Sequence, residues 1–200
     1  LQEDQLQLIS PLVSFGCLLL NELGQIERAK CYFSKLLHSL PSDHPDISSI
    51  QNNLGNVYSA KDELNLALKY YEDAYRKRRS TLSENHPLIA GSLHNIGLIY
   101  KDKGDFDRAL DYLHQSLAID EKNYPGDHSS KAITLQNIGL AYQSKGDIDS
   151  ALAWLKRAFH MYTRVLPAPH PYIASALGNL GSVYEKKGDL DRAIDFYRQR

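Results

Sequence analysis

The sequence has few cysteines, almost no net charge and no long run of apolar residues. Its two cysteines, Cys17 and Cys31, are too few for a disulfide framework and do not cluster as zinc ligands do. We interpret both as small buried thiols on helices and expect a reducing, cytoplasmic compartment. The longest apolar stretch, Cys17 to Leu20, is far shorter than the roughly 18 residues that a membrane-spanning helix needs.

The charge balance argues against nucleic acid as a partner. The chain has 23 lysines and arginines against 24 aspartates and glutamates, a formal net charge of −1. It has no basic tail that would hold it to a phosphate backbone or to a membrane surface, and we expect no membrane insertion. The apolar fraction of 42% is ordinary for a globular protein and is sufficient for a continuous core.

Motifs of catalysis and cofactor binding are also missing. The sequence contains no Walker-type loop, dinucleotide-binding fingerprint, GxSxG elbow or HExxH helix. We therefore expect neither enzymatic activity nor a cofactor or metal. The chain begins at Leu1 without a methionine or a signal-peptide pattern, and it stops at Arg200 inside a helical pattern. We expect it to be part of a longer protein.

The dominant feature that is present is a repeat with a period of 42 residues. Four columns of identical residues share this step, which chance does not produce. They are Gly55, Gly97, Gly139 and Gly181; Tyr58, Tyr100, Tyr142 and Tyr184; Ala67, Ala109, Ala151 and Ala193; and Asn53, Asn95, Asn137 and Asn179. A fixed period of this size is typical of solenoids, in which each unit stacks on the next.

Each unit is predicted to be a pair of helices, A and B. In the third unit helix A ends at Lys103, and Gly104 supplies the left-handed residue that closes a helix. Helix B then places apolar residues at helical spacing from Phe106 to Ile119. Asp62 takes the place of this glycine in the second unit, where we expect a less favourable turn.

Small residues mark the contact between the two helices of a pair. Gly97 and Ala109 fall where helices A and B approach most closely, and we expect Tyr100 to fill the space beside them. An isolated pair buries too little apolar surface to be stable, so stacked neighbours are needed to close the core.

The junctions between units carry a histidine column. The histidines are His44, His86, His128 and His170; Pro45, Pro87 and Pro171 follow three of them, and Ser129 follows the fourth. Proline suits the first turn of a helix, so we expect the next A helix to begin there, with the histidines in loop and capping roles. Successive units stand roughly 16–20 Å apart, too far for one column to share a metal ion.

The repeat divides residues 11–200 into one array. Its units are a degenerate 11–45, then 46–87, 88–129 and 130–171, and a truncated 172–200. In the first unit Cys17 takes the glycine position and Leu20 the tyrosine position, and helix B with its loop is four residues shorter before His44. Residues 1–10 are predicted to be the tail of a preceding helix, and Pro11 opens the first A helix.

These residues resemble the tetratricopeptide repeat. Its pattern places asparagine two residues before a glycine, then tyrosine, a second glycine and alanine three, seven and twelve residues after the first. The period and the His-Pro junction are similar to the subtype found in kinesin light chains. The resemblance, from about 11 to 200, implies an all-α fold, a right-handed α-solenoid of stacked antiparallel helix pairs. It also implies a concave groove, lined by the A helices, that binds peptide segments of protein partners.

The groove positions, carried over from the family, flank the glycine column. The candidate peptide-binding residues are Asn52, Asn53, Asn56, His94, Asn95, Leu98, Lys101, Gln136, Asn137, Leu140, Gln143, Asn179 and Ser182. They are spaced by helical turns and share one face. The cations with which some members of the family clamp a terminal carboxylate are absent at the matching positions. Leu98 and Leu140 suggest apolar pockets in a nearly uncharged groove.

The asparagine column has two interpretations. A carboxamide offers two donors and an acceptor, so a ladder of Asn53, Asn95, Asn137 and Asn179 is suited to pairing with the backbone of an extended peptide. Alternatively, these asparagines pack between units and bond to helix backbone. We favour the ligand role.

Two charged features are interpreted as structural. The basic run Arg76-Lys77-Arg78-Arg79 is not repeated in other units, and we favour a solvated helix end over contact with an acidic partner or phosphate. The acidic turns at Asp105, Asp147 and Asp189 suit helix N-termini, and calcium binding is not expected.

The sequence therefore favours a non-catalytic scaffold that binds a protein or peptide partner. The alternative is a structural or regulatory repeat module of a larger multidomain enzyme or switch protein, with the catalytic domain outside this segment. A third hypothesis is self-association through exposed solenoid ends.

Overall fold

The computed structural model describes residues 11–200, and over that range the chain is helical without strands. The predicted tail of a preceding helix, at residues 1–10, lies outside the described residues. The described residues divide into two compact units, residues 11–83 and 84–200. No helix among the described residues is long and apolar enough to cross a membrane.

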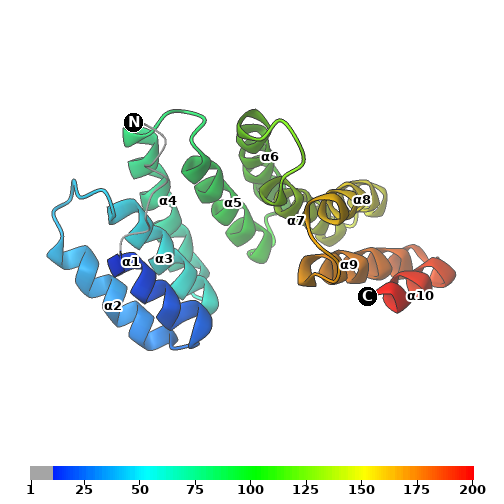
Figure 1. Cartoon of the computed structure of the whole chain (residues 1–200), viewed down its shortest axis with the longest axis horizontal. Helices are drawn as coiled ribbons and strands as arrows, with labels where there is room; N and C mark the ends of the chain where they lie inside the picture. Colours follow the sequence, from blue (N-terminus) through cyan, green and yellow to red (C-terminus); the bar gives the residue numbers. More distant parts are fainter. Residues whose placement is uncertain (1–10) are drawn as a thin grey trace. The chain divides into compact units, whose positions relative to one another are not determined.

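The first unit holds two helix pairs (Figure 1). Its elements are α1 (Pro11–Cys17), the π-helical segment η1 (Leu18–Glu22), α2 (Ile26–Ser39), α3 (Ile47–Ala60) and α4 (Leu64–Thr81). Helix α3 packs against both α2 and α4. Pro11 begins the first A helix as predicted, whereas α3 begins two residues after Pro45.

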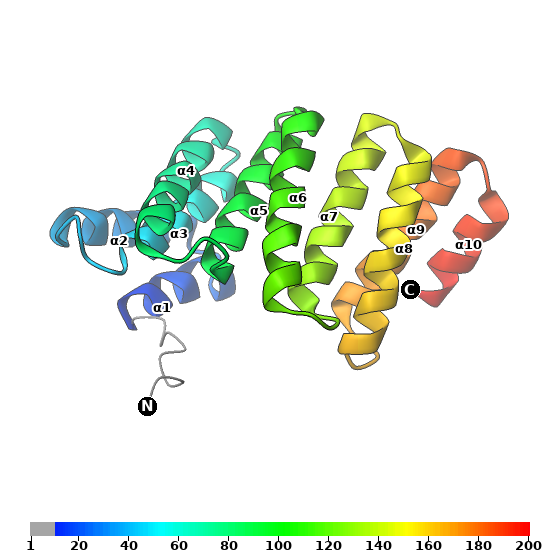
Figure 2. The same ribbon diagram turned by 90° about the horizontal axis from the view of Figure 1, so that it is seen from above.

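The second unit holds three helix pairs, which succeed one another along the chain (Figure 2). Its helices are α5 (Pro87–Asp102), α6 (Phe106–Asn123), α7 (Ser129–Lys145), α8 (Ile148–Val165), α9 (Pro171–Lys187) and α10 (Leu190–Gln199). Each helix packs on the next. Within each unit, the predicted all-α solenoid of stacked antiparallel helix pairs is confirmed.

The glycine column allows helices A and B to pack closely. A Cβ atom added at Gly139 would lie 2.7 Å from Leu155 Cγ and 3.1 Å from the Leu155 backbone nitrogen. At Gly97 the nearest atom is likewise a leucine Cγ, that of Leu113, at 2.9 Å. The space beside Gly97 is therefore filled by Leu113. Tyr100 is buried in the same helix pair, where it packs on Tyr112.

Three members of the tyrosine column, Tyr58, Tyr100 and Tyr184, stack on aromatic rings of helix B. Tyr58 lies on Tyr70, and Tyr100 on Tyr112, with centroids 5.3 and 5.5 Å apart and nearly parallel planes. Apolar side chains complete the interior of the second unit, where Leu135 and Ile138 of α7 pack with Leu113 and Leu117 of α6 and with Tyr162 of α8. Within the second unit, each pair thus shares its core with the next.

The turn from helix A to helix B requires a left-handed residue. Gly104, Gly146 and Gly188 have φ angles of +79°, +89° and +84°, which glycine adopts without a steric penalty. Asp62 stands in the corresponding place with φ +59°. The prediction of a less favourable turn at Asp62 is confirmed.

The histidine column caps the A helices. The Nδ1 atoms of His86, His128 and His170 each accept a hydrogen bond of 3.1 Å from the backbone N–H two residues on. His44 accepts at 3.2 Å from the backbone N–H of Asp46, which lies before α3, so its bond belongs to the loop and not to the helix cap. The predicted capping role is confirmed for His86, His128 and His170, because each of these imidazoles takes up a backbone donor that the helix leaves unsatisfied.

The first repeat, residues 11–45, contains one extra residue in its A helix, and the structure corrects the register that we predicted for it. Gly16, not Cys17, takes the close-contact position, since a Cβ added there would lie 2.3 Å from Phe33 Cζ. Leu19, not Leu20, is then the buried residue three positions on. The segment η1 accommodates the insertion, as π-helical turns commonly do.

Candidate functional site

We call the thirteen residues predicted to bind peptide the A-helix face, and we describe its part in each unit separately. Each of them is partly exposed. In the first unit the face consists of Asn52, Asn53 and Asn56 on α3. In the second unit it consists of His94, Asn95, Leu98 and Lys101 on α5, Gln136, Asn137, Leu140 and Gln143 on α7, and Asn179 and Ser182 on α9.

The amides of α3 are linked to each other and to their surroundings. Asn53 donates through Nδ2 to the Ser49 carbonyl at 3.0 Å, and its Oδ1 accepts from Asn56 Nδ2 at 3.2 Å. The same Oδ1 lies 3.5 Å from the Cys17 thiol. Tyr71 donates its hydroxyl to Asn56 Oδ1 at 2.7 Å. These contacts fix the orientation of both carboxamides in the first unit.

Asn52 contacts a buried arginine. Arg78, on α4, is only 4% exposed, and its Nη1 donates to Asn52 Oδ1 at 3.4 Å. Burial lowers the pKa of Arg78 to about 10. The interpretation of the basic run as a solvated helix end was therefore wrong for Arg78, which packs inward because the run continues around the helix and one of its four members must face α3.

Two helices of the second unit are joined at His94. Its Nε2 lies 3.3 Å from Asn137 Nδ2, and its Nδ1 lies 3.2 Å from Thr134 Oγ1. An amide nitrogen only donates, so Nε2 accepts and the Nδ1–H donates to Thr134. Burial, and secondarily the charge of Lys101, lowers the pKa of His94 to about 4. The ring is therefore neutral at physiological pH.

A second bridge joins α7 to α9. Gln143 donates through Nε2 to Ser182 Oγ at 3.2 Å. Leu140 packs on the core shared by α8 and α9 while remaining partly exposed. The charge of Lys101 is partly balanced by Asp102, at 3.4 Å. The face on α5, α7 and α9 is thus polar, nearly neutral and interrupted by two leucines.

The asparagine column shows the packing contacts that formed the alternative interpretation. Asn53 and Asn137 each donate to a carbonyl four residues earlier on their own helix, Ser49 and Ile133, at 3.0 and 3.1 Å. These bonds hold the side chains in place and occupy one donor of each amide. The second Asn137 contact, to His94, adds a link between neighbouring A helices.

Gln136 has the opposite character. Its Oε1 atom is buried, and no donor among the described residues reaches it. A buried carbonyl oxygen without a donor costs free energy that a ligand N–H would recover. Within the A-helix face, Gln136 therefore has an acceptor that no group of the described chain uses.

Two residues outside the predicted set of groove positions complete these contacts. Thr134 is buried and supports His94, and Cys17 approaches Asn53. Thr134 stands one period after Ser92, and this pair of hydroxyl residues is the sequence signal that could have identified it. Cys17 is partly buried, which raises the pKa of its thiol, whereas Cys31 is exposed. The interpretation of Cys31 as a buried thiol was wrong.

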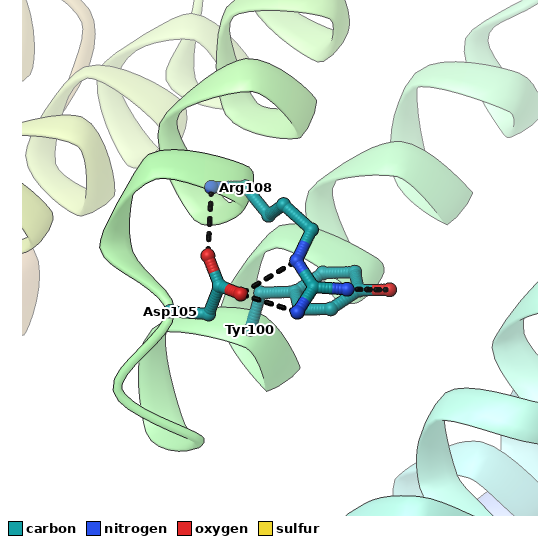
Figure 3. A network of polar contacts seen from close by, with 3 residues as sticks. All are labelled: Tyr100, Asp105 and Arg108. Atoms are coloured by element: carbon teal, nitrogen blue, oxygen red, sulfur yellow. Dashed lines mark hydrogen bonds and ion pairs between the residues drawn. The ribbon is translucent and has the colours of Figure 1, made fainter.

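The acidic turns between helices A and B form a separate set of polar contacts. Asp105 accepts from the Arg108 backbone N–H at 3.1 Å and from Arg108 Nε at 2.5 Å, and the guanidinium carbon lies 4.5 Å from the Tyr100 ring centre (Figure 3). Asp147 and Asp189 accept from backbone nitrogens in the same way. The predicted role of these aspartates at helix N-termini is confirmed.

Ion pairs connect the end of an A helix to the B helix of the preceding pair. Lys145 contacts Asp107 at 2.5 Å, and Lys187 contacts Asp149 at 2.6 Å. In the first unit Lys61 contacts Glu27 at 2.8 Å. All three lie at the surface, so they align the pairs and contribute little stability.

Sequence comparison identifies the repeat. The profile of the family described as tetratricopeptide repeat matches residues 46–122, 88–164 and 130–200. No curated protein sequence matches this chain.

Solved structures share the fold at low sequence identity. A kinesin light chain-like protein of Podospora anserina with nearly identical TPR-like repeats is 22% identical, with a TM-score of 0.75 over 94% of this chain and 90% of that one. BtubC from P. vanneervenii is 22% identical, with a TM-score of 0.80 over 94% and 76%. A Rap protein complexed with competence and sporulation factor is 16% identical, with a TM-score of 0.79 over 94% and 51%.

Proposed function

Because the chain belongs to the tetratricopeptide repeat family, we propose that it is a non-catalytic scaffold that holds an extended segment of a protein partner against the A-helix face. The observation that carries this proposal is the composition of the face on α5, α7 and α9. Its ten side chains are five amides, two leucines, a histidine, a lysine and a serine, all partly exposed. Such a surface recognises a peptide backbone with a few apolar anchors.

The fixed geometry of the face favours binding. His94, Asn137, Gln143 and Ser182 are held by hydrogen bonds between neighbouring A helices, so little side-chain entropy remains to be lost when a ligand arrives. Gln136 Oε1 lacks a donor within the described chain and suits an N–H of the bound segment. Leu98 and Leu140 stand 42 residues apart and suit two apolar side chains of the ligand.

A fold relative supports a partner of this kind. The Rap protein of similar fold was solved in complex with competence and sporulation factor. The similarity at 16% identity concerns the fold, so the chemistry of the ligand of this chain is taken from its own side chains.

The experiment is a selection followed by titration. A random peptide library displayed on phage is selected against the whole chain, and enriched peptides are titrated by fluorescence anisotropy. Leu98→Asp and Leu140→Asp place a charge on the face, and we expect each to weaken binding by about tenfold or more, because burying an unpaired carboxylate is costly.

The matched control is Ala153→Asp, at an exposed position of the B helix α8. We expect it to leave the affinity within about twofold, since solvated surface charges have small effects. Equal affinities for the Leu98, Leu140 and Ala153 variants, with circular dichroism showing intact helices, would place the ligand elsewhere and refute the proposal.

A further inference from the structure

A hollow in the first unit, far in sequence from the second-unit face, has a separate chemistry. It has a volume of about 540 Å³ and lies between the end of α2, the start of α3 and one side of α4. Its lining comprises Leu37, Leu40, Ser42, Ile47, Gln51, Asp73, Arg76, Lys77 and Ser80. None of these residues belongs to the A-helix face.

The hollow exists because α2 is short. Helix α2 has 14 residues, whereas the B helices α4, α6 and α8 have 18 each. The difference is about one helical turn. The side of α4 that carries Asp73, Arg76, Lys77 and Ser80 therefore lacks the last turn of a neighbouring B helix, and the loop at Ser42 crosses it instead.

The residue that faces this gap is unusual for its column. Lys77 stands at the position that Ile119 and Met161 occupy in the next two repeats. Met161 packs on the core of the second unit, which is the ordinary use of this position. A lysine here places an ammonium group beside Leu37, Leu40 and Ile47, so the hollow combines an apolar floor with a cation.

Two groups in the hollow have hydrogen-bonding capacity left over. Lys77 Nζ has three N–H donors, and one of them goes to the Ser42 carbonyl at 3.1 Å. Gln51 Oε1 is buried, and no donor within the described residues reaches it. Gln51 also differs from the residues at the same position of the following repeats, which are Leu93, Leu135 and Leu177. An acceptor and a cation thus replace two apolar side chains at one place.

The charges select the sign of the ligand. Arg76 pairs with Asp73, so these two side chains balance each other and the positive charge of Lys77 remains. A carboxylate satisfies that charge, an N–H satisfies Gln51, and an aliphatic side chain covers the leucines. A peptide segment with an acidic residue next to an apolar one supplies all three groups.

We infer that this hollow is a second binding site of the chain, which takes an acidic–apolar segment of a protein partner. Lys77 binds the carboxylate, Gln51 Oε1 accepts a backbone N–H, and Leu37, Leu40 and Ile47 receive the apolar side chain. The site is independent of the A-helix face, so each is tested without the other.

The test uses defined peptides and methyl NMR on the whole chain. The probe is a peptide of about eight residues that alternates leucine and glutamate. A leucine–glutamine peptide removes the charge, and a serine–glutamate peptide removes the apolar part. The methyl signals of Leu37, Leu40 and Ile47 report the hollow, and those of Leu98 and Leu140 report the A-helix face.

We expect the leucine–glutamate peptide to shift the hollow's methyl signals, and the two control peptides to bind about tenfold or more weakly. Lys77→Glu should weaken binding by about tenfold or more, as should Lys77→Met, which has the side chain that α8 accommodates at the same position. Arg79→Glu changes the charge by the same amount at an exposed residue of α4 outside the hollow and should leave the affinity within about twofold.

Other results overturn the inference. The hollow does not recognise this chemistry if the shifts are confined to Leu98 and Leu140, or if both Lys77 variants bind with unchanged affinity. Equal binding of the serine–glutamate peptide, or no binding of any probe, would show the same.

Discussion

Asn137 on α7 and His94 on α5 meet across neighbouring A helices, with 3.3 Å between Nδ2 of the amide and Nε2 of the ring. The contact needs a neutral imidazole, because a protonated ring has no acceptor to offer the amide. The same two residues belong to the A-helix face. Protonation of His94 therefore acts on the stability of the second unit and on the surface proposed to bind the partner.

Acidification is predicted to destabilise the chain through His94. Its pKa is about 4 in the folded chain against an ordinary value of 6.5. Between these values the unfolded chain holds a proton that the folded chain does not, so the free energy of unfolding falls as the pH drops from about 6.5 to about 4. The loss is at most about 3 kcal/mol, and smaller to the extent that solvent reaches the ring.

The variant His94→Gln isolates this effect, since Gln136 occupies the same position in the next repeat. Asp120 acts in the opposite direction, because burial raises its pKa, and the difference between wild type and variant removes its contribution. Urea unfolding at several pH values should show a shallower dependence for His94→Gln between pH 6.5 and 4. Parallel curves would exclude His94 as the titrating group.

Asp62→Gly is predicted to stabilise the chain. Asp62 has φ +59° where the four other turns between helices A and B have glycine, and a side chain in the left-handed region costs free energy that glycine avoids. We expect a gain of about 0.5–1 kcal/mol in chemical unfolding. Gly146→Asp makes the reverse change and should destabilise. A loss of stability on Asp62→Gly would mean that the aspartate side chain contributes more than its backbone strain costs.

Two glycines on A helices are predicted to respond to alanine with opposite sign. Gly139→Ala brings its Cβ within 2.7 Å of Leu155 Cγ and 3.1 Å of the Leu155 backbone nitrogen, and should destabilise by about 1–3 kcal/mol. Gly91→Ala meets no atom within 4 Å and should stabilise by about 0.5–1 kcal/mol through helix propensity. Thermal unfolding followed by circular dichroism ranks the two. The same sign for both would show that close packing does not explain the glycine column.

The histidine caps are predicted to contribute individually. His128 Nδ1 accepts from the Ser130 N–H at 3.1 Å, and His128→Ala should cost about 1 kcal/mol. His128→Asn keeps an acceptor at the cap and should recover most of this loss. If the two variants are equally unstable in urea, the capping bond is not the contribution of His128, and its stacking on Tyr124 at 3.8 Å is the better explanation.

The sequence predicted the fold well because the repeat constrains it many times over. In the second unit, glycines at two fixed offsets define the helix contact and the turn, a histidine defines the cap, and all three roles are observed. The register predicted for the first repeat was wrong because a π-helical turn accommodates an extra residue inside α1 and η1. Adjacent candidates such as Gly16 and Cys17 are separated only by which of them faces Phe33.

The site was predicted only as a list of positions. Which side chains bond to each other depends on the spacing between neighbouring A helices, so the contact of His94 with Thr134 and Asn137 is not visible in the sequence. The inward turn of Arg78 is hidden for a related reason. A run of four basic residues covers every side of a helix, and only packing decides which one is buried.

The most direct test of the scaffold function locates a bound segment on the chain. A peptide enriched by phage selection is labelled with a nitroxide, and paramagnetic broadening of side-chain signals is measured by NMR. The proposed function predicts broadening of the methyl groups of Leu98 and Leu140 and of the Gln136 side-chain amide, with exposed signals of α8 such as the Ala153 methyl unaffected. Broadening of Ala153 that leaves Leu98 and Leu140 sharp would contradict binding at the A-helix face.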